Sequence, residues 1–576
     1  MHAFAALYDA LDTSTRTGDK LTALKRYFES ADAESAAWTT YFLIGNKLKR
    51  TVKAGVLREA AVAASGLEPW LFEASYEVVG DLAETISLLV PDQQVNEPAE
   101  QISLSRWVTE RLAPLGSQSP DRQLVLLPQY WAAVPRGQRF LLTKLLTGAL
   151  RVGVSKALTL KALAQARGLD ANAVTQRLMG VWQPDASFFE RIAETPSGGD
   201  LRPYPFLLAY AVNDPAKELG DVASWQAEWK WDGIRAQVVK RAGRAAIWSR
   251  GEELVDEAFP DVLAHALNVP DGTVLDGELI VWKAGSRTPE PFASLQKRLG
   301  RKKPSPRMQA DYPVQLLAYD LLEVSGIDIR AQPLRQRRQQ LEALLSKSVH
   351  TERGEGFDAR ALESDPSLRS GRTGSGGSGH PGIQLSPALV AFTWTALTQT
   401  RTQAREQRAE GLMLKRLDSA YGVGRISGDW WKWKVAPLTV DCVMIYAQAG
   451  HGRRAGLYTD FTFAVWSESD APGGAGEPGQ RVLVPFAKAY SGLTDSELRE
   501  VDGWIRKNTL ERFGPVRSVT PELVFELGFE GIAASTRHKS GIAVRFPRIL
   551  RWRRDKPAVE ADSLTNLGQM LHLQNH

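Results

Sequence analysis

The chain has 576 residues, which is too long for a single hydrophobic core and predicts roughly three to four domains. Apolar residues make up 43% and charged residues 24%, a composition that excludes a mostly disordered chain and a collagen-like one. Lys and Arg total 71 against 66 Asp and Glu, so the formal net charge is only +5, too weak to identify a partner.

The chain has one cysteine, Cys442, which cannot form an internal disulfide or a multi-cysteine zinc site. The N-terminal segment lacks the basic start and the apolar core of a signal peptide. No run of about 18 uncharged apolar residues is present, so no membrane-spanning helix is predicted. We therefore expect a soluble, cytoplasmic protein with no membrane partner.

Residues 1–202 are predicted to form a helical domain. Apolar residues recur three and four positions apart between Phe4 and Phe28, and again between Phe140 and Ala166. Polar segments that contain Pro and Gln, such as residues 91–101, separate these stretches.

Residues 203–435 are predicted to form a mixed α/β domain. Short runs of strand-forming residues begin at Trp225 and include residues 272–282 and 314–324, with a helical stretch at 333–347. Residues 351–386 are rich in Gly and Ser, and we expect them to form a flexible surface insertion.

Residues 436–560 are again rich in short strands, and they predict a small β-barrel. Residues 561–576 are polar, and we expect them to form a frayed C-terminal tail.

The string Glu228-Trp229-Lys230-Trp231-Asp232-Gly233 is the most informative one for chemistry. It places a lysine at the end of a strand, before a glycine turn. An exposed lysine is protonated at neutral pH and is a poor nucleophile, whereas desolvation or a nearby cation frees its lone pair. A solvated lysine on a surface β-turn is the simpler explanation of this string by itself, so the string is not sufficient alone.

Six further motifs follow in a fixed order, and they are Ser249-Arg250-Gly251, Asp276-Gly277-Glu278, Tyr319-Asp320, Glu410 to Lys415, Trp430 to Lys434, and Arg553 to Lys556. With this series, almost the whole chain resembles the ATP-dependent DNA ligases, and most closely the bacterial ones with an N-terminal DNA-binding domain. The resemblance implies an all-α DNA-binding domain, an α+β adenylation domain and an OB-fold β-barrel domain.

The resemblance also implies that Lys230 attacks the α-phosphate of ATP to form lysyl-AMP, which then activates the 5′-phosphate of a nick. Glu228 is expected to read the adenine amino group, and Tyr319 to stack on the adenine. Arg235 and Arg250 are expected to contact the ribose and phosphates. The remaining implied nucleotide ligands are Glu278, Lys415, Arg425, Lys432 and Lys434.

Glu278 and Glu410 are expected to hold Mg²⁺ or Mn²⁺, since hard cations prefer oxygen ligands, or else to contact the ribose. The resemblance implies that the last motif orients the pyrophosphate leaving group through Arg553, Asp555 and Lys556.

One departure from the family pattern is visible. Ile426 stands where these ligases commonly have a second basic residue, which puts the assignment of the neighbouring Arg425 in question.

In the helical domain, the resemblance implies contact with duplex DNA through Lys144, Arg151, Gly153 and Ser155. A nick can have any sequence, so binding is expected to rely on phosphates. Without the resemblance, the same segment is a packed helix that ends at a glycine. We expect a monomer that acts on nicked duplex DNA, and the sequence identifies no protein partner.

Other functions share the lysine motif or parts of this architecture. An RNA ligase or a capping guanylyltransferase also forms a lysyl-nucleotide, although the helical domain and the last motif argue against both. An NAD-dependent ligase would need a four-cysteine zinc site, which one cysteine cannot build. A DNA-binding scaffold without catalysis predicts loss of Lys230, Glu278 or Lys432, and all three are present.

Overall fold

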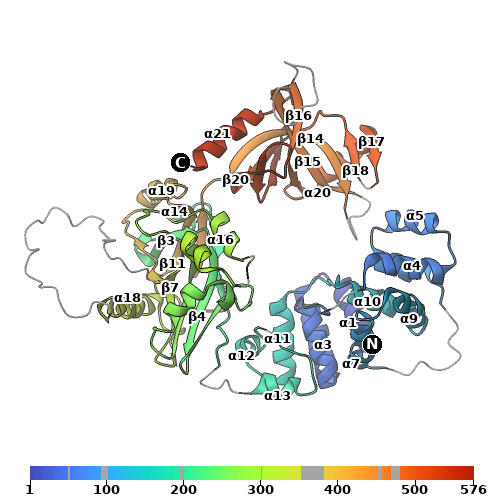
Figure 1. The fold of residues 1–576 in the computed structure, drawn as a ribbon, viewed down its shortest axis with the longest axis horizontal. Helices are drawn as coiled ribbons and strands as arrows, with labels where there is room; N and C mark the ends of the chain where they lie inside the picture. Colours follow the sequence, from blue (N-terminus) through green and yellow to red (C-terminus); the bar gives the residue numbers. More distant parts are fainter. Residues whose placement is uncertain are drawn as a thin grey trace, which may run out of the picture. The chain divides into compact units, whose positions relative to one another are not determined.

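The structure is a computed structural model that describes residues 1–49, 52–92, 102–180, 182–194, 200–299, 301, 303–351, 382–450, 457–468, 481–514 and 516–575. The chain divides into two compact units, Ala157–Val435 on the one hand and Met1–Lys156 with Ala436–His576 on the other. Figure 1 shows the helices and strands of the chain coloured along the sequence. Within the described residues, no helix is long and apolar enough to cross a membrane.

The N-terminal part is helical, as the apolar periodicity predicts. It contains α1 (His2–Thr13), α2 (Thr17–Ser30), α3 (Ala33–Leu43), α4 (Ala54–Ser65), α5 (Pro69–Val79), α6 (Leu82–Leu89), α7 (Leu104–Arg106), a π-helical turn (Trp107–Leu112), α8 (Ala113–Leu115), α9 (Pro120–Ala132) and α10 (Arg136–Thr147). Side chains fix several helix starts, because Asp32 caps α3 and Asp81 caps α6 by accepting a backbone N–H.

The core of this part is built from one apolar stripe of each helix. Phe28, Leu57, Trp131 and Leu142 are fully buried. The Trp131 indole N–H donates to the Thr143 hydroxyl at 3.1 Å, which joins α9 to α10 and satisfies a buried donor.

The unit Ala157–Val435 begins with most of α11 (Lys156–Arg167), followed by α12 (Ala171–Arg177) and α13 (Phe188–Ala193). Two sheets follow. The first has the strand order β10-β3-β11-β13-β2, formed by β2 (Tyr210–Ala211), β3 (Trp225–Trp231), β10 (Ala388–Leu389), β11 (Ala409–Arg416) and β13 (Trp430–Lys434).

The second sheet has the order β5-β4-β6-β7-β8, with β9 beside β7. Its strands are β4 (Ile234–Arg241), β5 (Arg244–Ser249), β6 (Thr273–Val281), β7 (Val314–Val324), β8 (Ile327–Asp328) and β9 (Ile383–Leu385). A short parallel pair, β1 (Leu207–Leu208) and β12 (Gly424–Arg425), lies outside both sheets.

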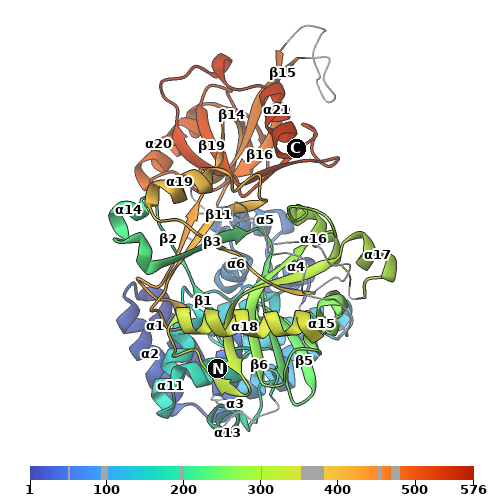
Figure 2. The same cartoon turned by 90° about the vertical axis from the view of Figure 1, so that its left-hand side faces the viewer.

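The α-helices of the described part of this unit also include α14 (Pro215–Glu218), α15 (Pro260–Ala266), α16 (Phe292–Leu299), α17 (Pro306–Asp311), α18 (Leu334–Thr351) and α19 (Trp394–Thr402). Helices α15 and α18 pack on the second sheet through Val262 and Leu341, and Figure 2 shows α18 across its face. Most of the expected insertion 351–386 lies outside the described residues, but its last part includes β9.

The two sheets meet in a shared core. Val239 and Tyr319 from the second sheet pack with Trp430 and Met413 from the first. On its opposite face, the first sheet buries Trp229, Leu412 and Trp433 in a separate cluster. Strands β3, β11 and β13 of the first sheet therefore each have one apolar face, and their other face lines the space between the sheets.

The C-terminal part is rich in strands. Its main sheet has the order β16-β15-β14-β18-β17, and β19 pairs with both β14 and β22. The elements are β14 (Leu438–Ala449), β15 (Tyr458–Glu468), β16 (Arg481–Ala489), α20 (Asp495–Lys507), β17 (Thr509–Phe513), β18 (Val516–Val519), β19 (Val524–Phe529), β20 (Gly531–Ala534), β21 (Ile542–Arg545), β22 (Arg548–Trp552) and α21 (Leu564–Asn575).

The expectation of a frayed tail after residue 560 is wrong for most of that segment, because residues 564–575 form α21. Leu567 is fully buried in the core with Phe463 and Phe525, and Leu564 and Met570 pack against the same cluster. The spacing of these apolar residues gives the helix one buried face, which anchors it to the sheet.

Candidate active site

Lys230 lies on β3, and its side chain faces the space between the two sheets. The strand ends at Trp231, and a tight turn through Gly233 leads into β4. A Cβ atom at Gly233 would lie 2.3 Å from the carbonyl oxygen of Leu279, so only glycine allows this close approach. The glycine of the motif thus holds β3 and Lys230 close to β6.

Glu410 on β11 joins Lys230 to Lys434. It forms ion pairs with the ammonium groups of Lys230 and of Lys434, the latter at 3.2 Å. Burial raises the pKa of Glu410, but the two lysines outweigh that effect and hold the pKa below its ordinary value. Glu410 is therefore ionised. A metal cation would compete with the two lysines for this carboxylate, and a phosphate would compete with the carboxylate for the two lysines.

A β-bulge explains how Glu410 reaches this face. The pairing of β11 with β3 shifts register between Ala409 and Leu412. Strict alternation would place Glu410 on the same face as the buried Leu412, whereas the extra residue turns it toward the lysines. Gly411 has φ +139°, and a Cβ there would lie 2.3 Å from the carbonyl oxygen of Trp433, so the bulge requires glycine.

Glu228 and Lys415 form a fully buried ion pair. Both side chains are 1% exposed, and the Lys415 ammonium donates to the two Glu228 oxygens at 3.0 and 2.9 Å. The same ammonium lies 3.9 Å from the ring centroid of Tyr319 and 4.5 Å from that of Trp430. Burial lowers the pKa of Lys415, and Glu228 opposes that effect.

Arg235 is held by Asp276, a carboxylate of the sequence motifs that had no predicted role. Its guanidinium donates to both oxygens of Asp276, at 3.1 and 2.6 Å, and Asp276 also accepts from the Tyr421 hydroxyl at 2.6 Å. The rings of Phe206 and Trp430 lie 5.1 and 5.2 Å from the guanidinium carbon. Arg235 is thus fixed by an anion and by aromatic rings.

Glu278 on β6 faces the same site. Burial raises its pKa to about 8, although the charges of Lys230 and Arg235 lower it. Burial also lowers the pKa of Lys432, and the charges of Lys434 and Arg425 lower it further. The expected ligand residues on β3, β6, β11 and β13 are therefore electrostatically coupled.

Two expected arginines are more exposed. Arg250 lies in the turn after β5, where its backbone N–H donates to the Arg235 carbonyl at 2.9 Å. Arg425 lies exposed on β12, and it is close enough to Lys432 to affect its pKa. Ile426 is exposed, and its Cδ1 lies 2.0 Å from where a Cβ atom at Gly422 would be.

Glu278 and Glu410 are the carboxylates of this site that could hold a Mg²⁺ ion that keeps most of its water. In the described ranges, no cluster of three or more His, Cys, Asp or Glu could enclose a metal. Mg²⁺ is commonly held by one or two carboxylates plus substrate phosphates. The raised pKa of Glu278 indicates a buried carboxylate that lacks sufficient positive charge, which a divalent cation would supply.

The last motif lies in the C-terminal part, where Arg553 binds Asp555 at 2.8 Å and Asp441 at 2.5 Å. Lys556 binds Asp441 as well, at 2.9 Å. The Arg553 guanidinium lowers the pKa of Asp555 to about 2. The structure thus brings Arg553 and Lys556 together on Asp441 of β14, which the motifs did not single out, and Asp555 pairs with Arg553.

The four residues expected to contact DNA differ in their surroundings. Arg151 and Ser155 are exposed, and Gly153 accepts from the Lys20 ammonium at 2.9 Å through its carbonyl oxygen. Arg151 and Gly153 line a groove of about 420 Å³ at the end of α10. Lys144 is only 14% exposed and forms an ion pair with Asp81, so it is not presented to solvent like Arg151.

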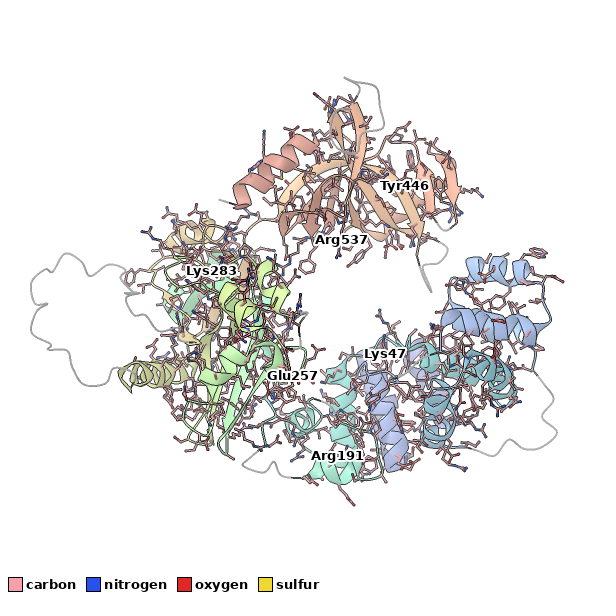
Figure 3. All side chains as sticks on the ribbon, in the orientation of Figure 1. Lys47, Arg191, Glu257, Lys283, Tyr446 and Arg537 are labelled. Carbon is pink, nitrogen blue, oxygen red and sulfur yellow. The ribbon has the colours of Figure 1, made fainter. Side chains whose placement is uncertain are left out.

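Additional cations surround this groove. Lys156 lines it, and Lys47, labelled in Figure 3, lines an adjoining hollow together with Lys144. Neither Lys20 nor Lys47 was singled out in the sequence. Their placement depends on contacts between segments more than 100 residues apart, which the local pattern does not encode.

Comparisons with known proteins agree along the chain. Residues 1–164 match the family model "DNA ligase N terminus", residues 206–365 match "ATP dependent DNA ligase domain", and residues 454–556 match "ATP dependent DNA ligase C terminal region". A probable DNA ligase from Koribacter versatilis is 29% identical over 100% of this chain and 97% of its own length.

A DNA ligase from Thermococcus fumicolans is 26% identical over 99% of this chain and 98% of its own length. Among solved structures, the chain described as "Pmar-Lig_PreS3" has a TM-score of 0.54 at 16% identity, over 96% of this chain and 99% of that one. The structural similarity supports the fold, whereas the sequence matches carry the family assignment.

Proposed function

Because the chain belongs to the ATP-dependent DNA ligases, we propose that Lys230 is the nucleophile that forms lysyl-AMP. The observation that carries this proposal is the arrangement of Lys432, Lys434 and Glu410 around Lys230 on one face of the sheet. Phosphoryl transfer requires cations where negative charge develops more than it requires acid–base groups.

In the first step, the Lys230 nitrogen bonds to the α-phosphorus of ATP, and the bond to pyrophosphate breaks. Glu410 orients the Lys230 amine before the attack, and Lys432 and Lys434 contact the α-phosphate oxygens. Glu278 and Glu410 would hold Mg²⁺, which supplies further positive charge to the phosphates when bound.

The adenine is proposed to occupy the space where the Lys415 ammonium now lies over the Tyr319 ring. Glu228 then accepts a hydrogen bond from the adenine amino group, and Lys415 moves to the α-phosphate. Arg235 and Arg250 contact the ribose and phosphates, with Arg235 held by Asp276.

In the later steps, AMP passes to the 5′-phosphate of a nick, and the 3′-hydroxyl displaces AMP to seal the strand. Arg151, Gly153 and Ser155 contact the phosphates of the duplex, and Lys144 contributes through its position beside Lys47. Arg553, Asp555 and Lys556 orient pyrophosphate while it leaves.

We further propose that the strand-rich C-terminal domain is an OB-fold and that the protein acts as a monomer. The proposed domains are residues 1–202, 203–435 and 436–560, followed by residues 561–576. The match of residues 1–164 to the N-terminal family model supports keeping the start of α11 with the preceding helices.

Covalent labelling tests the proposal. AMP-free protein is incubated with α-labelled ATP and Mg²⁺, and label that survives denaturation is compared with that on Lys230→Ala. We expect label on the wild type alone, and its release when nicked DNA is added. Label from GTP would instead assign the chain to the capping class, and no label would support a non-catalytic DNA-binding protein.

A further inference from the structure

Asp441 on β14 receives two cations on a single oxygen. Its Oδ2 accepts from the Arg553 guanidinium at 2.5 Å and from the Lys556 ammonium at 2.9 Å. Asp441 is only 9% exposed, and the two cationic side chains are 19% and 20% exposed. The cluster is therefore largely sheltered from water, where charge–charge interactions are strong.

The carboxylate is needed to keep the two cations together. Two like charges bonded to one oxygen lie close enough to repel each other, and the anion between them offsets that repulsion. The second oxygen of Asp441, Oδ1, is buried and has no hydrogen-bond partner in the part of the chain that the structure describes. A buried acceptor without a partner costs stability, so the residue is poorly explained by stability alone.

Arg553 keeps donors for a ligand. A guanidinium has five N–H donors. The Nε and Nη2 groups donate to Asp555, and Nη1 donates to Asp441. Since Nη1 and Nη2 each carry two hydrogens, both can still donate to a phosphate oxygen. Asp441 and Asp555 thus hold the guanidinium from two sides without using all of its donors.

We propose that Asp441 is a positioning residue that assembles Arg553 and Lys556 into a two-cation clamp for pyrophosphate. The inference rests on the proposed function, in which these cations face the leaving group during lysyl-AMP formation. In that step the N–P bond forms and the P–O bond breaks. The electron pair of the broken P–O bond remains on the pyrophosphate oxygen, and the Lys230 proton passes to solvent.

The clamp has a consequence that separates it from a structural role. Pyrophosphate is present only in the first step and in its reversal, whereas the sealing of an already adenylated nick involves none. A residue that positions the clamp should therefore affect the first step alone. A residue that only stabilises the C-terminal domain should affect every step in proportion to the folded fraction.

The experiment compares Asp441→Asn with a matched control, Asp562→Asn. Asp562 accepts the Asp441 backbone N–H at 2.8 Å, so its substitution perturbs the same place without touching either cation. Three rates are measured with the full-length protein: enzyme adenylation by ATP, removal of AMP from the adenylated enzyme by pyrophosphate, and sealing of a nick that already carries 5′-AMP.

For Asp441→Asn we expect at least a tenfold loss in adenylation and in the pyrophosphate reaction, with sealing of the adenylated nick within about threefold of wild type. Asp441→Glu keeps the charge but moves it, so it should lose an intermediate amount in the same two rates. Equal losses in all three rates, or no loss in any, would overturn the proposal. Failure of the wild type to become adenylated would instead overturn the proposed function itself.

Discussion

The buried ion pair between Glu228 and Lys415 yields a quantitative prediction for Lys415→Met. At 2.9 Å, two unit charges attract each other by about 6 kcal/mol at an effective dielectric constant of about 20. Removing one partner leaves the other charge buried without compensation, which typically costs about 3–5 kcal/mol. We expect the nucleotide-free variant to lose that amount of stability around β3 and β11.

Hydrogen exchange followed by mass spectrometry measures this loss locally in the full-length chain. A loss of 3–5 kcal/mol corresponds to exchange that is faster by roughly a hundredfold to several thousandfold in the peptides of β3 and β11. The double variant Glu228→Gln/Lys415→Met should regain most of the loss, because it removes both charges. The exposed pair Arg335–Asp418 is the control, and Arg335→Met should cost about 0–1 kcal/mol.

Two results would refute this reasoning. A loss below about 1 kcal/mol for Lys415→Met would mean that water, a proton or another cation compensates Glu228. Additive effects of the two substitutions would mean that the contact contributes no coupling energy.

Three further predictions concern other parts of the site. Tyr421→Phe removes the hydroxyl that donates to Asp276 at 2.6 Å, and it should raise the KM for ATP by about tenfold, as measured by enzyme adenylation. An unchanged KM would show that this contact with Asp276 does not affect nucleotide binding. Because the folded-state pKa of Glu278 is raised to about 8, the folded protein binds more protons than the unfolded chain between about pH 4.5 and 8. Its unfolding free energy in EDTA should therefore fall as pH rises through that window, and urea titrations should show a flatter dependence in Glu278→Gln. Arg151→Gln should weaken binding to nicked DNA and reduce the slope of log K against log salt by about one, as measured by fluorescence anisotropy; an unchanged slope would argue against a phosphate contact.

The sequence predicts the parts of the site that depend on local pattern. The alternation in Trp430 to Lys434 predicts that Lys432 and Lys434 share a strand face. In the structure the charges of Lys434 and Lys230 both act on Lys432. The glycine after Lys230 is also a local signal of a turn. In the structure Gly233 lies in that turn, close to the carbonyl oxygen of Leu279.

The remaining features depend on contacts that no local pattern encodes. Asp276 lies 41 residues from Arg235, and Asp441 lies 112 residues from Arg553, so neither pairing is visible in the sequence. Period-two alternation also misplaces Glu410, because the bulge at Gly411 inserts one residue into the strand. The helix after residue 560 was predictable, since its apolar residues have helical spacing, but the polar composition of the segment obscured that signal.

The position of Trp430 makes its fluorescence a probe of nucleotide binding. Its indole is 1% exposed, lies 4.5 Å from the Lys415 ammonium, and is nearly perpendicular to the ring of Tyr421. The emission of an indole responds to nearby charge, so displacement of that ammonium by a nucleotide would change the intrinsic fluorescence. Rapid mixing could then follow nucleotide entry in the unlabelled protein in real time.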